Sequence, residues 1–460
     1  MPAQRRRVER RVVAVVFCAA LAVCALLTKP HAISWNDASR FATIDALVTR
    51  HTVAIDGSPF AATTEDKYRF RGRTYSDKPP ALALQGAAVA ALLAPFGVSF
   101  SRTPGTAVYL ITLFTVGVWF ALGCAYAYAF QRVLGLDRRI ALLVAALTGL
   151  GTLALPYATV LANHVPSGAA VLAALFHLAR ARRRAGLDVV LGGLFLTLAY
   201  AFDAAAVAFV PAAVILLWGA SGRAWLALAS AGIPIVAAQL AYNASVSTGW
   251  GPPAMNQTTW AEPSSPFHRA DHSAFHFTTP GDYVRYAIYL VFGGKGLLSY
   301  TPLTLVAGFG FARMWRTPQR RLALAILLSC AAYFTLMVAF TNDYGALNYG
   351  ERRYVNLFFV LGIGLGPAIA ALSSGWAGIL VRLAAIWSVA IALLGAVAPF
   401  GEPPGVWGIA FAAQEFGRLA QRAPAQAAID LVALAVTILF LLRAWSSAAL
   451  PTSGTGRPAS

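Results

Sequence analysis

Charged side chains are scarce in this sequence, and their scarcity excludes most classes of protein. Only 12% of the 460 residues are charged, whereas 58% are hydrophobic. An average soluble domain has about 25% charged and about 45–50% apolar residues. Because so few charges do not cover the surface of a water-soluble globule of this length, a soluble enzyme and a disordered chain are both excluded. The composition predicts an all-α polytopic membrane protein.

Acidic residues are scarcer still, and cysteines are almost absent. Asp and Glu number 18 against 36 Lys and Arg, a formal net charge of +18. Such an excess would indicate a nucleic-acid partner in a soluble protein. Here arginines in short cytoplasmic loops account for it, so we expect no nucleic-acid partner. Cys18, Cys24, Cys124 and Cys330 all lie in apolar runs, without the spacing of a disulfide framework or a metal site.

The N-terminus combines a basic cluster with an apolar run. Five arginines in residues 5–11 precede the apolar residues 12–27. A cleaved signal peptide has the same pattern, but no small-x-small cleavage site follows before Lys29 and Pro30. We therefore predict an uncleaved first span whose basic end lies in the cytoplasm.

The apolar run 79–96 decides the topology of everything that follows. It has about 16 apolar residues where a span needs about 20. If it crossed the bilayer, the arginine clusters at 132–139, 180–184 and 313–321 would fall outside the cell. Because basic residues favour the cytoplasmic side, we interpret 79–96 as a re-entrant or juxtamembrane helix on the outer side.

The remaining apolar runs then predict about twelve spans, with both chain ends in the cytoplasm. After the first span they lie near 105–131, 139–157, 164–180, 187–203, 204–219, 223–242, 299–314, 320–340, 353–372, 377–396 and 427–444. The polar segments between them collect on the outer face, and the sequence shows no internal repeat of the kind found in many transporters. Any chemistry is therefore expected at the outer surface.

The first outer loop, 29–104, holds two candidate functional groups. Asp37 and Arg40, one helical turn apart, suit a base and the cation that orients it; alternatively, Asp37 caps the helix that follows. Lys78, where the loop meets the bilayer, is placed to reach a lipid phosphate, or else simply extends its amine to the interface.

Two short motifs and the order of the elements resemble a known class of membrane enzymes. The motifs are Asp37-Ala38-Ser39-Arg40-Phe41-Ala42 and Tyr75-Ser76-Asp77-Lys78-Pro79, and Gly350-Glu351-Arg352-Arg353-Tyr354 leads into a late span. With one span, a large outer loop and many later spans, the chain resembles the GT-C-type glycosyltransferases, which use polyprenyl-phosphate sugars. It is most similar to the branch of protein O-mannosyltransferases and the lipid A aminoarabinose transferase.

The resemblance implies that Asp37 acts on the acceptor and that Lys78 contacts the carrier phosphate, with Tyr75 in the same motif. Where many members have a second acidic residue after the first, this chain has Ala38. A divalent metal is therefore not supported, and no cofactor is expected. The second outer turn, which often supplies another Asp, carries Asn163 and His164 instead. These two residues suit sugar hydroxyls, or His164 proton transfer, and helix capping is an equal alternative.

Four further residues complete the predicted substrate site. Arg352 and Arg353 stand before a span, where a guanidinium pair suits a phosphate. Lys295 lies among glycines that let a backbone approach a ligand, and Asp203 ends a span, where a carboxylate is costly unless it faces a polar cavity. Outer-interface anchoring is the alternative for the arginines, and pairing with an outer-loop arginine is the alternative for Asp203.

Together these patterns predict a glycosyltransferase at the outer face of the cytoplasmic (inner) membrane. It would move a sugar from a polyprenyl-phosphate donor to a hydroxyl of a glycan, lipid or protein acceptor, with inversion and with Asp37 as base. The predicted organisation is a catalytic membrane module over 1–242, an outer loop over 243–298 and C-terminal spans over 299–460. The alternative function is a transporter or flippase of a lipid-linked or anionic solute.

Overall fold

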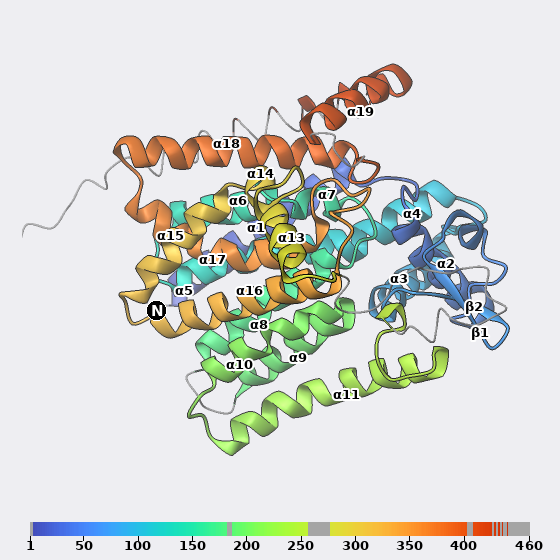
Figure 1. Ribbon diagram of the computed structural model, residues 1–460, viewed down its shortest axis with the longest axis horizontal. Helices are drawn as coiled ribbons and strands as arrows, with labels where there is room; N and C mark the ends of the chain where they lie inside the picture. Colours follow the sequence, from blue (N-terminus) through green and yellow to red (C-terminus); the bar gives the residue numbers. More distant parts are fainter. Residues whose placement is uncertain are drawn as a thin grey trace, which may run out of the picture.

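The computed structural model is a bundle of helices with one small two-stranded sheet (Figure 1), and it describes residues 3–181, 186–255, 277–402 and 408–425, with scattered positions up to 439. The principal helices are α1 (Ala3–Leu27), α2 (Trp35–Arg50), α3 (Pro80–Leu93), α4 (Pro104–Thr112), α5 (Val118–Val133), α6 (Arg138–Leu150), α7 (Ala154–Ala158), α8 (His164–Arg180), α9 (Leu187–Phe202), α10 (Val210–Leu216), α11 (Gly222–Val246), α13 (Pro280–Phe292), α14 (Leu297–Tyr300), α15 (Leu303–Trp315), α16 (Arg320–Phe340), α17 (Val355–Ala371), α18 (Gly375–Val397) and α19 (Gly408–Arg422). Short helical turns η1 (Pro59–Thr63), η2 (Ala94–Phe96), η3 (Leu113–Gly117), η4 (Ala204–Phe209), η5 (Pro253–Met255) and η6 (Arg352–Tyr354) connect them. The predicted helical membrane fold is confirmed.

The described residues contain fewer candidate spans than the twelve predicted. Within the described residues, six helices are long and apolar enough to cross a membrane, or seven if the pair bent by 91° at Leu303 counts as one. The six are Arg7–Leu27, Pro104–Val133, Gly222–Val246, Arg320–Phe340, Arg352–Ala371 and Gly375–Val397. The count of twelve is therefore not confirmed. Several predicted spans became short helices, such as α6 with 13 residues and α9 with 16, and the predicted span 427–444 falls mostly outside the described residues.

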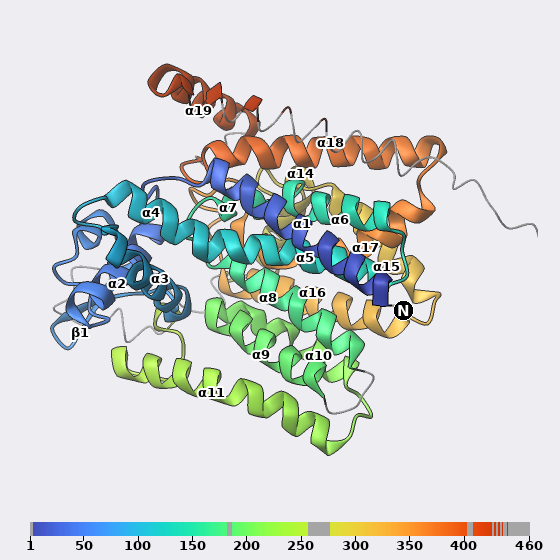
Figure 2. The same cartoon turned by 180° about the vertical axis from the view of Figure 1, so that it is seen from behind.

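The elements of the first loop gather at one end of the bundle. Figures 1 and 2 show α2, α3 and the sheet together there, while the N-terminus lies at the opposite end. We call the end that carries α2, α3 and the sheet the loop end. Contacts between distant segments agree with the predicted sides: Glu9 pairs with Arg132 at 3.2 Å and with Arg138 at 3.0 Å, all three predicted to be cytoplasmic.

A hairpin that the sequence analysis did not predict shapes the loop end. Strands β1 (Lys67–Phe70) and β2 (Arg73–Ser76) pair antiparallel, with Phe70 opposite Arg73. The two-residue turn, Arg71-Gly72, has positive φ at both positions, 50° and 74°. This is the turn whose twist matches a hairpin, and glycine takes its second position without strain. The hairpin delivers Asp77 and Lys78 to the start of α3.

Helix α3 follows the hairpin and packs directly on α2. Its 14 residues rise about 21 Å, less than the roughly 30 Å of a hydrocarbon core. The contact is close, since a Cβ at Gly86 would lie 2.4 Å from the Cδ1 atom of Ile44. With η2 it forms a short apolar helix of the length predicted for 79–96, too short to count among the candidate spans.

Candidate functional site

A cavity of about 490 Å³ opens at the loop end, and most of the predicted site residues line it. It takes side chains from α2, the end of the hairpin, the start of α8, the end of α9, α16 and η6, which lie far apart in the sequence, from Asn36 to Arg353. The predicted residues that line it are Arg40, Lys78, Asn163, His164, Asp203, Arg352 and Arg353. Residues on both sides of the predicted boundary at 242 therefore contribute to one site.

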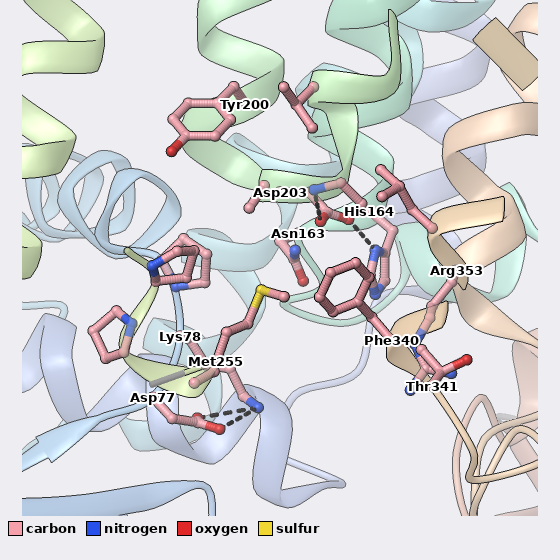
Figure 3. Close-up of a pocket in the computed structure, with 18 of the residues that line it drawn as sticks. Asp77, Lys78, Asn163, His164, Tyr200, Asp203, Met255, Phe340, Thr341 and Arg353 are labelled. Atoms are coloured by element: carbon pink, nitrogen blue, oxygen red, sulfur yellow. Dashed lines mark hydrogen bonds and ion pairs between the residues drawn. The ribbon is translucent and has the colours of Figure 1, made fainter. Parts of the chain in front are cut away.

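The ammonium group of Lys78 is already paired with carboxylates. It lies 2.7 Å from an oxygen of Asp66 and 3.1 Å from an oxygen of Asp77. Figure 3 shows Lys78 and Asp77 on one side of the cavity, across from Asn163 and His164. Lys78 therefore reaches the cavity as part of an ion-pair cluster rather than as an isolated cation.

Arg353 is paired in the same way. Its guanidinium donates to the two carboxylate oxygens of Asp343 at 2.9 and 2.6 Å and to Glu351 at 3.1 Å. Burial would raise the pKa of Asp343, but the guanidinium outweighs it and holds this pKa well below its usual range. Arg353 therefore serves to hold the segment before α17 together.

Arg40 is buried without a carboxylate at hydrogen-bonding distance. Its side chain is 1% exposed, and it donates to the side chain and backbone oxygens of Asn36 and, at 2.6 Å, to Oδ1 of Asn163. Its Nε is buried and has no hydrogen-bond partner. Burial, together with the nearby positive charge of Arg352, lowers the pKa of Arg40 to about 10. A buried cation in this setting favours the binding of an anion.

Arg352 lies on the same cavity and has even fewer partners. Within the described part of the chain no hydrogen bond or ion pair of its guanidinium is recorded, and its Nε is buried without a partner. Its Cζ atom lies 5.9 Å from the ring centre of Phe400. In the part of the chain that the structure describes, Arg40 and Arg352 are thus the two lining cations without a carboxylate at hydrogen-bonding distance, although Asp77, Asp66 and Asp37 act on the charge of Arg40 from farther away.

Asp203, His164 and Asn356 form a hydrogen-bonded group at the cavity. Nδ1 of His164 lies 2.7 Å from Oδ2 of Asp203, and Asn356 donates to the same oxygen at 2.7 Å. The other carboxylate oxygen accepts from the backbone N–H of Ala205 at 3.1 Å. The prediction that Asp203 faces a polar cavity therefore agrees with its position.

Asp37 lies beside the cavity but does not line it. Its carboxylate accepts hydrogen bonds from the backbone N–H groups of Ile33, Ser34 and Ala38 and from the Ser34 hydroxyl, at 2.7–3.1 Å. With Ser34 as the N-cap it closes a capping box at the start of α2, so it is the third residue of the helix rather than its cap. Burial keeps the pKa of Asp37 above its usual range, although the hydrogen bonds oppose this. Asp37 therefore takes part in capping α2, as the alternative held, but Ser34 is the cap; Asp37 as a base stays a prediction.

Two other predicted residues also lie away from the cavity lining. Tyr75 is paired across the hairpin with Tyr68, their ring centres 6.0 Å apart. Lys295 is buried and donates to the backbone oxygens of Ala346, Asn348 and Glu402 at 2.5–2.9 Å. Their predicted substrate contacts are therefore not supported: Lys295 holds two loops together, a role that its glycine-rich surroundings did not indicate.

Several lining residues were not predicted. They include Asn36, Asp77, Tyr200, Gln239 and Tyr333. The signal for Gln239 was available, because an amide inside an apolar helix is costly unless it faces a polar space. Tyr333 gives no such signal, since an aromatic residue is ordinary in a span. Among the described residues, no group of three or more His, Cys, Asp or Glu side chains is arranged to hold a metal ion.

Comparisons with known proteins give similarities of fold. No protein-family model matches the chain, and no curated protein matches it. A structure of ArnT from Cupriavidus metallidurans bound to undecaprenyl phosphate is 14% identical with a TM-score of 0.47, covering 95% of this chain and 77% of that one. ArnT in the apo state is also 14% identical with a TM-score of 0.48, covering 96% of this chain and 77% of that one. The apo oligosaccharyltransferase of Archaeoglobus fulgidus is 14% identical with a TM-score of 0.48, covering 92% of this chain but 59% of its own length. Both proteins are GT-C membrane glycosyltransferases, the class that the sequence motifs resemble.

Proposed function

We propose that this protein is a membrane glycosyltransferase that moves a sugar from a polyprenyl-phosphate carrier to an acceptor hydroxyl. The observation that carries the proposal is the placement of Arg40 and Arg352 on one cavity, each without a carboxylate at hydrogen-bonding distance among the described residues. A guanidinium matches phosphate oxygens well, and a desolvated one binds them more strongly than in water. The carrier phosphate would bind between these two side chains.

The cavity also offers apolar surface to a lipid carrier. Leu336, Met337 and Phe340 of α16 line it, as does Met255. Figure 3 labels Phe340 and Met255. A site with cations on one side and apolar side chains on another fits an amphiphilic donor better than a soluble nucleotide sugar. We infer that the loop end faces the outside of the cytoplasmic membrane, as the arginine distribution predicts.

The chemistry proposed is a single displacement. The acceptor hydroxyl attacks the anomeric carbon, the bond to the phosphate oxygen breaks, and the phosphate leaves with the electron pair, so the configuration inverts. Arg40 and Arg352 would stabilise the charge that develops on the phosphate, each well-placed donor contributing about 3–4 kcal/mol. Asp37 as base remains a prediction from the resemblance alone.

Transport of an anionic solute is the competing function, and the arrangement of the site favours transfer. Lys78, Asp203 and Arg353, which come from distant parts of the chain, converge on one cavity at the loop end. A transporter predicts instead a path through two related halves near mid-membrane.

Carrier binding tests the proposal directly. The probe is undecaprenyl phosphate, titrated into the purified detergent-solubilised protein and followed by native mass spectrometry. We expect Arg352→Gln to weaken binding by about 10- to 100-fold, because a charge-assisted hydrogen bond contributes about 1.5–3 kcal/mol. The control is Arg285→Gln, since Arg285 is exposed on α13 and should not affect binding. Equal binding by wild type and Arg352→Gln would refute the phosphate site.

The transferred sugar requires a second measurement. Mass spectrometry of envelope glycans and lipids from cells with and without the gene should reveal a product that lacks one sugar when the protein is absent. Uptake or flipping of a lipid-linked solute by proteoliposomes, without any transferred sugar, would favour the transporter instead.

A further inference from the structure

The group formed by His164 and Asp203 has a geometry that the proposed function does not yet use. His164 is the first residue of α8, and Asp203 directly follows α9, so the packing of these two helices brings the pair together. The Nδ1 to Oδ2 distance is 2.7 Å. The two further donors to Asp203, from Asn356 and Ala205, leave its carboxylate little freedom to turn.

The hydrogen bonds determine which ring nitrogen of His164 faces the cavity as an acceptor. An ionised carboxylate accepts hydrogen bonds but does not donate, so Nδ1 must carry the proton in the bond to Asp203. In a neutral imidazole the other nitrogen, Nε2, then has a free lone pair. Among the described residues, no hydrogen bond to Nε2 is recorded, and the His164 ring lines the cavity (Figure 3).

A second histidine on the same helix shows what a purely structural pair looks like. Nδ1 of His177 lies 2.7 Å from Asp188, and its Nε2 lies 3.1 Å from the hydroxyl of Tyr126. Both nitrogens of His177 are therefore occupied, and the ring does not line the cavity. The two histidines are about 20 Å apart along α8, at 1.5 Å per residue. Of the two histidines on α8, His164 is the one that combines an oriented ring with an open acceptor at the site.

We propose that His164 is the general base of the transfer and that Asp203 is its positioning residue, an inference that rests on the proposed function. Nε2 takes the proton of the acceptor hydroxyl while the hydroxyl oxygen bonds to the anomeric carbon. The bond from that carbon to the phosphate oxygen breaks, and the electron pair leaves with the polyprenyl phosphate. The proton passes from the imidazolium to solvent after the products separate, so no other reactant is needed.

The surroundings of His164 suit this cycle. The Asp203 carboxylate stabilises the imidazolium while it exists, as the carboxylate of a catalytic triad does. The positive charges of Arg352 and Arg353 oppose protonation of the ring and so promote the return of the proton. His164 and the proposed phosphate-binding Arg352 line the same cavity, so the acceptor and the lipid-linked donor can bind in it side by side.

The test compares four variants by rate and by carrier binding. His164→Gln, His164→Ala, Asp203→Asn and the matched control His177→Gln are added to membranes of a deletion strain, whose lipid-linked sugars serve as donors. We expect transfer by both His164 variants to fall by about 100-fold or more, as for loss of a general base. Undecaprenyl phosphate binding should stay at the wild-type level, and His177→Gln should transfer normally.

Added imidazole separates a base from a structural residue. It should raise the transfer rate of His164→Ala at least tenfold, because the smaller side chain leaves space for imidazole. The rate of His164→Gln should not change. Transfer by His164→Gln above a tenth of the wild-type rate overturns the inference. If the His164 variants do not fold, Asp203→Asn decides: an unchanged rate in a variant that binds undecaprenyl phosphate also overturns it. Failure of the wild type itself to transfer sugar or bind the carrier refutes the proposed function instead.

Discussion

Positive charge at the cavity is divided between side chains that have carboxylate partners and side chains that do not. Lys78 is held by Asp66 and Asp77, and Arg353 by Asp343 and Glu351. Arg40 and Arg352 have no bound carboxylate among the described residues. A guanidinium without a carboxylate partner is stabilised most by binding a new anion, so we expect the phosphate to bind at Arg40 and Arg352.

Replacing Asp37 distinguishes a catalytic base, whose loss lowers transfer, from a residue of the helix cap, whose loss lowers stability. We expect Asp37→Asn to lower the stability of the folded protein by about 1–2 kcal/mol. The carboxylate now accepts hydrogen bonds from backbone N–H groups, and the NH₂ of asparagine would point a second donor at one of them. The folded fraction should keep its transfer activity. Thermal unfolding in detergent and transfer per folded molecule measure the two effects.

A matched control exists for this change. Asp282 makes a similar contact with Thr279 at the exposed start of α13, so Asp282→Asn should cost less stability. A fall in transfer of 100-fold or more in stable Asp37→Asn protein would instead support Asp37 as the base.

At the scale of elements, three charged side chains hold the segment between α16 and α17 in place. Lys295 donates to the backbone of Ala346 and Asn348, and Glu402 accepts from Tyr300 and from the N–H of Gly350. Arg353 adds the ion pairs with Asp343 and Glu351. These contacts place η6, and with it Arg352, at the cavity.

Acid should loosen this segment. The pKa of Asp343 is lower in the folded protein than its ordinary value of about 3.9, despite burial, because of Arg353. Its ion pair therefore stabilises the fold fully above about pH 4, and that stability is lost as the pH falls through the folded pKa. We expect the unfolding temperature of the wild type to drop between about pH 4 and pH 2, by more than that of Asp343→Asn.

The Asp343→Asn variant should already be less stable at pH 5. A control is Glu415→Gln, which removes an exposed pair with Arg418 on α19 and should follow the wild type. If wild type and Asp343→Asn lose the same stability over this pH range, the ion pair with Arg353 does not carry the effect.

At the scale of the whole molecule, the cavity and the basic cluster near the N-terminus lie at opposite ends of the bundle. The loop end carries the cavity, and the other end carries the basic residues around Glu9, Arg132 and Arg138. Whether α3 crosses the membrane determines the orientation of every later helix, and with it the side on which the arginine clusters lie. Its 14 residues favour a place at the surface.

Cysteine labelling tests this topology. In a background without Cys18 and Cys330, Thr63→Cys and Ser101→Cys flank α3 on both sides, and all three of Thr63, Ser101 and Thr317 are exposed. We expect a membrane-impermeant maleimide to label Thr63→Cys and Ser101→Cys in intact cells, but Thr317→Cys only after permeabilisation. Labelling of one but not the other across α3 would mean that this helix crosses the membrane.

The sequence by itself determined the class of protein and the neighbourhood of the site. Scarce charge and long apolar runs predict a helical membrane protein, because these properties depend on composition and local order alone. Seven of the ten predicted site residues line the cavity, since loops predicted on the same side of the membrane meet there. The count of twelve spans is not confirmed, because apolar runs do not show where a helix breaks, as α9 does at Asp203.

Only the tertiary structure decided which of these residues remain available to a ligand. Lys295 among glycines and Arg353 before a span look like phosphate ligands in sequence, yet backbone oxygens and carboxylates from distant segments engage them. The partner of His164 is 39 positions away in the chain. Hydrogen bonds and ion pairs form between residues that the fold brings together, so local sequence does not predict whether a charged group keeps a free side for chemistry.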